Sequence, residues 1–293
     1  SKKSCRNWKR YSRGNWMVEK FKFLDIEDNG KYIICHLSNP PSHTLTSGGV
    51  EEIHKFLDIV EQHNDLRVLA FTGSGQDVFI KHYEVGELAD TAEKNISEKK
   101  PQQSPLELHG FHKMLLRLRD LKAIVVAGIN GNTAGGGCEF SLGCDLRIMK
   151  HGDYKIGLPE TSVGILPGGG GTQRLSRLIG SSRALDLILH AKLLTPQEAF
   201  EMGIINRLVS EDNFLNDLHT YCQDLSSRAP IALEQVKKII HQGLDMSLEE
   251  SLLLEQEAFN ITMNSKDAAR AMRSLLNSQN NIEEDTKFEW KGE

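Results

Sequence analysis

Two acids and two glycine runs lie close together in the middle of this 293-residue chain, and their chemistry suggests a reactive site. Residues 135–137 are three consecutive glycines, and Glu139 follows shortly after them. Glu160 ends a Leu-Pro-Glu sequence, and four more glycines occupy residues 168–171. Glycine lets a backbone N–H approach a ligand closely because no Cβ stands in the way, and two carboxyl groups can act as general acid and base. The pattern indicates an enzyme that polarises a carbonyl group and moves protons beside it.

The elements that must position these residues are a buried strand, predicted at residues 123–129, and a helix that begins in the glycines and ends near Gly143. A glycine-rich turn between strand and helix presents free N–H groups at the positive end of the helix dipole. Neither of the glycine patterns that bind nucleotide phosphates is present. The turn could therefore hold a negatively charged oxygen, or simply allow close packing of helix and strand. Apolar neighbours predict that Glu139 is partly desolvated, which would raise its pKa.

Strand and helix signals alternate along the rest of the chain and predict an α/β fold with parallel strands. A hairpin is predicted around the turn at residues 28–30, with its second strand at residues 32–37. Further strands are predicted at residues 68–72 and 146–149, and another ends at Val209. Helices are predicted at residues 50–62, 106–118, 184–190, from Thr195 onward, and at 232–243, 248–262 and 267–276. Residues 87–105 are polar and are predicted to be an exposed loop or weak helix.

We expect three parts in the chain: a disordered basic arm at residues 1–16, an α/β core at 17–225 and a helical region at 226–293. The arm contains six basic residues and no acid. It has no apolar core, so it is not a secretory signal, and no stretch of the chain is apolar over the length of a membrane span. We expect a cytoplasmic protein of a bacterium, or one of the mitochondrial matrix if residues 1–16 are the remnant of a transit peptide.

Composition excludes several other classes of protein. The formal net charge of -5 gives no general attraction to nucleic acid, so no nucleic-acid partner is expected. The five cysteines are an odd number and form no CxxC pair, which argues against a disulfide framework and a zinc site. We expect no metal.

Many separated motifs of the chain occur in the order typical of one family. They lie at residues 122–131, 135–139, 144–145, 157–160, 164–167, 170–175, 195–199 and 202–206. From about residue 20 to residue 275 the chain resembles the crotonase family, the enoyl-CoA hydratase/isomerase superfamily. The resemblance implies the crotonase (ClpP-like) fold, in which repeated ββα units form a core sheet and a C-terminal helical region forms trimers, often paired into hexamers.

The resemblance also implies roles for particular residues. Two backbone N–H groups of such enzymes hold the thioester oxygen of an acyl-CoA, and they correspond here to Gly136 and Lys81. The two glutamates of the family's hydratases correspond to Glu139 and Glu160. Further candidates for substrate binding are the neighbours of the two donors, namely Ile80, His82, Tyr83 and Gly135. The expected substrate is an acyl-CoA, with no separate cofactor because coenzyme A is part of the substrate.

The loop at residues 81–84 departs from the family pattern, because His82 stands where the family has glycine. The main hypothesis is hydration of a 2-enoyl-CoA, since both glutamates are present. His82 leaves open a double-bond isomerase or a thioester hydrolase of the same fold. A third hypothesis is a non-catalytic member that binds CoA or RNA.

Overall fold

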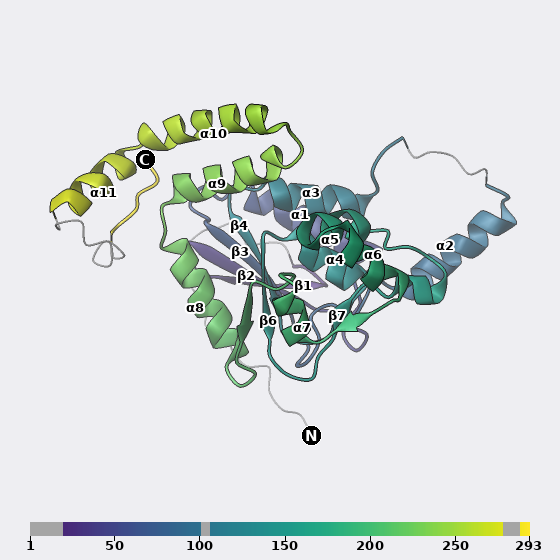
Figure 1. The fold of residues 1–293 in the computed structure, drawn as a ribbon. Coiled ribbons are helices and arrows are strands. Elements are labelled where there is room, and N and C mark those ends of the chain that lie inside the picture. Colours follow the sequence, from purple (N-terminus) through teal and green to yellow (C-terminus); the bar gives the residue numbers. More distant parts are fainter. Residues whose placement is uncertain (1–19, 101–105, 278–287) are drawn as a thin grey trace, which may run out of the picture.

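The computed structural model describes residues 20–100, 106–277 and 288–293 (Figure 1). The predicted basic arm at residues 1–16 lies outside these ranges. A six-stranded sheet forms the centre, with the strand order β1-β2-β3-β4-β6-β9. The strands are β1 (Leu24–Asp28), β2 (Tyr32–Leu37), β3 (Val68–Gly73), β4 (Ile124–Ile129), β6 (Leu146–Lys150) and β9 (Arg207–Val209).

The pairing within this sheet follows from the residue types of its strands. β3 and β4 are buried along their whole length and pair in parallel, as expected for short apolar runs covered on both faces. β1 and β2 pair antiparallel across the turn, which confirms the predicted hairpin. The remaining neighbours in the sheet are parallel, as predicted.

Helices cover both faces of the sheet. The larger core cluster joins one face of the sheet to α1 (Ser47–Val60), α3 (Gly110–Asp120) and α4 (Gly136–Gly143). On the other face, Phe214, Leu218 and Cys222 of α8 (Phe214–Ser226) pack against alternate residues of the strands. The helices α5 (Gly171–Ile179), α6 (Ser181–Leu189) and α7 (Pro196–Glu201) follow the glycine-rich region. Thr195 is the N-cap of α7, as its sequence predicts, and Glu198 completes a capping box with it.

A small second sheet positions the segments that carry the candidate site residues. It consists of β5 (Thr133–Ala134), β7 (Ile156–Gly157) and β8 (Leu193–Leu194), in that order. β5 pairs in parallel with β7, and it immediately precedes the glycines that lead into α4. Glu160 follows β7 in a short 3-10 helix, η1 (Glu160–Val163). The pairing of β5 and β7 therefore brings the two acid-bearing segments side by side.

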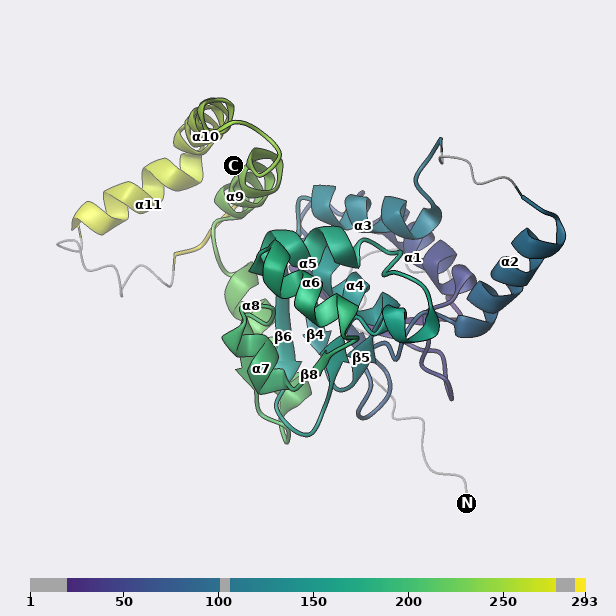
Figure 2. The ribbon, with the colours of Figure 1, turned by 45° about the vertical axis from the view of Figure 1, so that its right-hand side comes forward.

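Two parts of the chain extend from this body. α2 (Val85–Ser97) is a regular helix without a buried residue, where the sequence indicated a loop or weak helix; residues 101–105 are not described. The helices α9 (Pro230–Gly243), α10 (Leu248–Met263) and α11 (Lys266–Asn277) form an arm to one side of the sheet (Figures 1 and 2). Within the described ranges, no helix combines the length and apolar character needed to cross a membrane.

A buried lysine of α9 joins the helical arm, formed by α9, α10 and α11, to the body. Lys237 Nζ lies 2.8 Å from Asp145 Oδ2 and donates to the carbonyl oxygens of Leu118 and Ala123 at 2.9 and 2.8 Å. A buried ammonium group needs such partners because water no longer solvates it. These bonds fix the start of the helical arm against the body.

Candidate active site

The loop after β3 lies between two other backbone segments. The N–H of Lys81 donates to the carbonyl oxygen of His43 at 2.8 Å, and the carbonyl oxygen of Lys81 accepts from Ala134 N–H at 3.0 Å. Both backbone groups of Lys81 are therefore used within the protein. The prediction that Lys81 supplies an N–H to a substrate oxygen is wrong, because this donor already has an acceptor.

The free donor of the loop is two residues further on, at Tyr83. Tyr83 pairs in parallel with Leu45. Leu45 N–H donates to His82 O at 3.0 Å and Glu84 N–H donates to Leu45 O at 2.8 Å. In a parallel pair the groups of the flanking residues face the partner, so the N–H of Tyr83 faces the opposite side. Among the hydrogen bonds of the described residues, this N–H has no acceptor.

Within the described residues, a second N–H without an acceptor is that of Gly136, whose role toward a substrate oxygen stays a prediction. Gly136 is the first residue of α4, where a helix leaves its N–H groups without partners. A Cβ built on Gly136 would lie 2.8 Å from Tyr83 Cβ and 3.1 Å from Tyr83 N, which is too close for any side chain. The preceding Gly135 has a φ of 50°, a conformation that favours glycine. The glycines thus bring the Gly136 and Tyr83 amides together.

The backbone of Ile80 and Gly137 holds the loop after β3 against the same turn. Thr133 Oγ1 donates to the carbonyl oxygen of Ile80 at 2.8 Å. A Cβ on Gly137 would lie 2.2 Å from that oxygen, so only glycine allows this approach. The Ile80 side chain is 2% exposed and belongs to the core. Ile80, a sequence candidate for substrate binding, therefore has a packing role in the structure.

Glu139 is buried in α4 and is held by the second glycine run. Its side chain is 3% exposed, and its Oε1 accepts from the N–H groups of Gly169 and Gly171 at 2.7 and 2.8 Å. Burial raises the pKa of Glu139, as the sequence predicted, while the two N–H bonds oppose that rise. Since both bonds go to Oε1, Oε2 is left to accept or release a proton.

Two residues that the sequence did not identify hold this glycine loop. His109 Nε2 donates to Gly168 O at 3.1 Å, and Arg174 Nη1 donates to Gly169 O at 3.2 Å. Arg174 belongs to the recognised motif at residues 170–175, but nothing in the sequence distinguishes His109 from other histidines of the chain. Both act on Glu139 through the backbone that binds it.

Glu160 lies on the other side of the same turn. A Cβ built on Gly135 would be 3.0 Å from Glu160 Oε1. Glu160 Oε2 is buried and has no hydrogen-bond partner in the part of the chain that the structure describes. Burial, and secondly the charge of Glu139, raise the pKa of Glu160 to about 7. The structure thus brings the two predicted glutamates into one electrostatically coupled site.

His82 also borders this turn, and it makes a local hydrogen bond. Its Nδ1 donates to Tyr83 O at 2.7 Å, and its Cβ lies 3.9 Å from a Cβ built on Gly135. The structure therefore gives His82 a position at the rim, with one ring nitrogen bound to the backbone.

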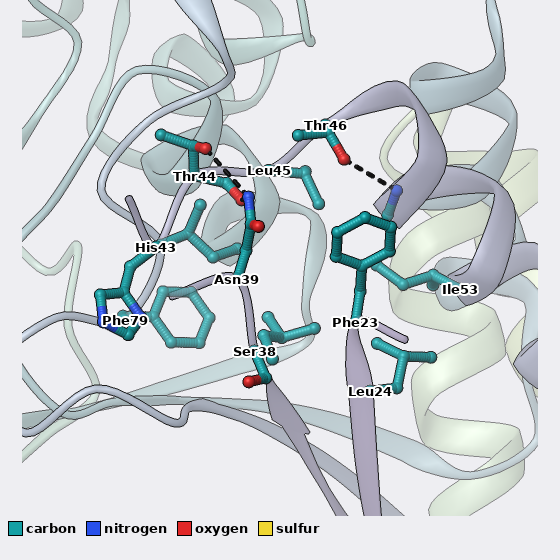
Figure 3. A pocket seen from close by; sticks show the side chains of 13 residues that line it. Phe23, Leu24, Ser38, Asn39, His43, Thr44, Leu45, Thr46, Ile53 and Phe79 are labelled. Carbon is teal, nitrogen blue, oxygen red and sulfur yellow. Dashed lines mark hydrogen bonds between the residues drawn. The ribbon is translucent and has the colours of Figure 1, made fainter. Parts of the chain in front are cut away.

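A small cavity lies beside the segment that holds the loop (Figure 3). It lies between the first two strands and α1, is lined by residues such as Phe23, Ile53 and Phe79, and has a volume of about 20 Å³, room for about one water molecule. At its edge Asn39 Nδ2 donates to Thr44 O at 2.9 Å. Neither Glu139 nor Glu160 lines this cavity, so it is not the candidate reactive site.

The described residues contain no group of three or more histidine, cysteine, aspartate or glutamate side chains arranged to hold a metal ion. The site consists of two amide donors and two carboxyl groups. Such an arrangement can stabilise negative charge on an oxygen and transfer protons beside it.

Comparison with known proteins shows what the whole chain is similar to. A family model described as enoyl-CoA hydratase/isomerase matches residues 28–293. The short-chain-enoyl-CoA hydratase of Clostridium acetobutylicum is 30% identical over 256 residues, which cover 86% of this chain and 93% of that protein. The crotonyl-CoA hydratase of Syntrophomonas wolfei is 27% identical, with 87% and 95% covered. The crystal structure of an enoyl-CoA hydratase from Bacillus anthracis superposes with a TM-score of 0.79 at 26% identity, covering 93% of this chain and 100% of that one. The predicted crotonase fold is confirmed.

Proposed function

Because this chain belongs to the enoyl-CoA hydratase/isomerase family, we propose that it adds water across the double bond of a 2-enoyl-CoA. It is an enoyl-CoA hydratase-like enzyme of the crotonase superfamily. One observation among the described residues carries the specific proposal: two backbone donors without acceptors, Tyr83 and Gly136, meet at a turn that is bordered by the carboxyl groups of Glu139 and Glu160.

The two N–H groups would hold the thioester carbonyl oxygen. When water adds to the β carbon, negative charge develops on that oxygen as an enolate. Fixed donors aimed at the oxygen stabilise this charge without reorganisation, and loss of one such donor costs about 10²–10³ in rate. Tyr83 replaces Lys81 in this role, because the N–H of Lys81 is bound to His43.

The carboxyl groups would divide the proton transfers. Glu139 Oε2 takes a proton from water as the water oxygen bonds to the β carbon. Glu160, with its pKa near 7, gives its proton to the α carbon as the enolate collapses. The carbon–carbon double bond becomes a single bond, and the proton on Glu139 returns to Glu160 through solvent. Atoms and charge balance without another reactant.

A direct assay tests this function. We expect hydration of crotonyl-CoA, followed as loss of the enoyl absorbance, with the 3-hydroxyacyl-CoA as product. Longer 2-enoyl-CoAs and saturated acyl-CoAs serve as comparisons in the same experiment. Absence of turnover with 2-enoyl-CoAs of every length would refute the proposal, and release of free CoA from saturated thioesters would favour the hydrolase.

No observation in the structure favours the other hypotheses. The hydrolase depended on His82, whose Nδ1 is bound to the backbone carbonyl of the next residue. The isomerase and the non-catalytic CoA- or RNA-binding member remain predictions, and the basic arm at residues 1–16 is not described. A location in the bacterial cytoplasm, or in the mitochondrial matrix, also remains a prediction. We propose no cofactor apart from the coenzyme A of the substrate.

We further propose that residues 226–293 assemble the protein into a homotrimer, or a dimer of trimers. Ala258 is the only buried residue of α10, whereas several of its large apolar side chains are exposed, including Leu248 at 76%, Leu253 at 65% and Phe259 at 60%. An apolar surface of this kind is typical of an interface. Sedimentation should give a multiple of three of the 32.8 kDa chain mass, and a monomer would contradict the assignment.

A further inference from the structure

We infer that the aromatic rings of Tyr83 and Phe111 form a fixed wall at the acyl end of the site and restrict the substrate to short acyl chains. This inference rests on the proposed function. It concerns side chains that the proposed mechanism does not use, since Tyr83 takes part in that mechanism only through its backbone N–H.

The Tyr83 ring begins at the oxyanion donors. Its Cβ lies 2.8 Å from a Cβ built on Gly136, so the side chain leaves the backbone beside the point where the thioester oxygen would bind. The ring then meets Phe111 edge to face, with centroids 6.3 Å apart and planes at 76°. This is a favourable arrangement for two aromatic rings.

Phe111 continues the wall to the catalytic carboxyl group. A Cβ built on Gly169 would lie 2.2 Å from Phe111 Cε1 and 2.6 Å from Glu139 Oε2, so the ring edge and the carboxyl oxygen border the same point. Phe111 is 6% exposed and belongs to the core. The two rings together therefore extend from the carbonyl-binding amides to the proton-transferring oxygen.

A hydrogen bond fixes the hydroxyl end of the Tyr83 side chain. Its hydroxyl donates to Glu87 Oε2 at 3.0 Å. Glu87 in turn accepts from Ser47 N–H at 3.0 Å and from Ser47 Oγ at 3.1 Å, which links the start of α2 to the start of α1. Burial and then Glu87 raise the pKa of Tyr83 to about 12, so its hydroxyl stays protonated and keeps donating. The ring cannot swing aside without breaking these bonds.

The position of the wall has a consequence for the acyl chain. The thioester oxygen is held by the amides of Tyr83 and Gly136, so the α and β carbons must lie toward Glu139 and Glu160. Carbons beyond the β carbon then continue past Glu139 Oε2, where the edge of Phe111 lies. A chain of four carbons ends there, whereas a longer chain needs the space that the rings occupy.

The test compares the specificity constants, kcat/KM, for crotonyl-CoA and 2-decenoyl-CoA. We expect the wild-type protein to prefer crotonyl-CoA roughly 100-fold, a discrimination within reach of a pocket that excludes methylene groups. Tyr83→Ala keeps the backbone N–H and removes the ring, and should reduce this preference by roughly tenfold or more. Tyr83→Phe keeps the ring and should retain most of the preference.

A matched control is Tyr32→Ala. Tyr32 is also partly buried, and its hydroxyl is also hydrogen-bonded. It lies at the start of β2, beside the start of β3, whereas the loop of Tyr83 follows the end of β3. The Tyr32→Ala variant should show the same kcat/KM preference for crotonyl-CoA as the wild type. Thermal melting checks that each variant folds, and Tyr83→Leu replaces Tyr83→Ala if the latter does not. Equal turnover of both substrates by the wild type, or an unchanged preference in the folded Tyr83 variant, would overturn the inference.

A binding measurement separates this inference from the proposed reaction. Calorimetry with butyryl-CoA and decanoyl-CoA needs no turnover. If the wall is present, butyryl-CoA binds more tightly to the wild type, and Tyr83→Ala reduces or reverses the difference. Absence of enoyl-CoA hydration together with this binding pattern would reject the hydratase and retain the wall; hydration without the binding pattern would do the opposite.

Discussion

Replacement of Glu139 by glutamine is expected to lower kcat for crotonyl-CoA by about 10⁴-fold, the upper end of the range for general acid–base catalysis. The amide oxygen of glutamine can still accept from Gly169 and Gly171, so the side chain keeps its place. The NH₂ group that replaces Oε2 cannot take a proton from water. The loss should therefore fall on kcat, with KM little changed.

Glu198→Gln is the matched control for this variant. Glu198 is a glutamate in the capping box of α7, away from the catalytic turn, and its amide can keep the helix cap. We expect the wild-type rate. If Glu139→Gln retained more than a tenth of the wild-type kcat, Glu139 could not be the base of the reaction.

Replacement of Glu160 by glutamine is expected to lower kcat by about 10³-fold, because glutamine cannot give a proton to the α carbon. With a pKa of about 7, Glu160 loses its proton as the pH rises through neutrality. The kcat/KM of the wild type should therefore fall on the alkaline side of about pH 7, and the residual rate of the variant should lack this fall. An identical pH profile in both proteins would assign the proton donor to another group.

The Glu160→Gln substitution should also change the stability of the protein. Burial raises the pKa of folded Glu160 from its ordinary value of 4.5 to about 7, so the folded state binds this proton more tightly than the unfolded state. The stability from the protonated carboxyl is complete below about pH 4.5 and is lost as the pH rises through 7. Glutamine stays neutral, so Glu160→Gln should raise the melting temperature at pH 8 and change it little at pH 4. A lower melting temperature at pH 8 would contradict burial as the cause.

Much of the fold could be predicted because its signals are local. The apolar run that became β4 and the glycines that begin α4 fix the strand–turn–helix unit that carries Glu139. The antiparallel hairpin follows from its turn residues, and the capping box of α7 follows from Thr195 and Glu198. The regular helix at α2 was harder to predict, because it buries no residue and so has no core-facing pattern.

The proposed oxyanion donor in the loop shows what the sequence could not provide. The resemblance to the family implied that the donor is Lys81, but the direction of each N–H depends on the pairing partner. Leu45 is that partner, and it lies far from the loop in the sequence. The pairing with Leu45 turns the amide of Tyr83 toward Gly136, while His43 occupies the amide of Lys81.

The hydrogen-bond donors to Glu139 could not be predicted from the sequence for the same reason. The four-glycine run was visible, but its function as the donor to a distant carboxyl group depends on the tertiary fold. The contact between Tyr83 and Phe111 likewise joins a loop to a helix that follows it only after α2 in the sequence. Residue types indicate the candidate chemistry of the site, and tertiary pairing determines which atoms are placed to perform it.

The most direct test of the proposed site is a crystal structure of the Glu139→Gln protein with crotonyl-CoA bound. We predict that the thioester oxygen lies about 2.7–3.2 Å from both the Tyr83 and Gly136 backbone nitrogens, with the β carbon facing residue 139 and the α carbon facing Glu160. A thioester oxygen bound elsewhere, or contacting the Lys81 nitrogen in place of the Tyr83 nitrogen, would contradict it.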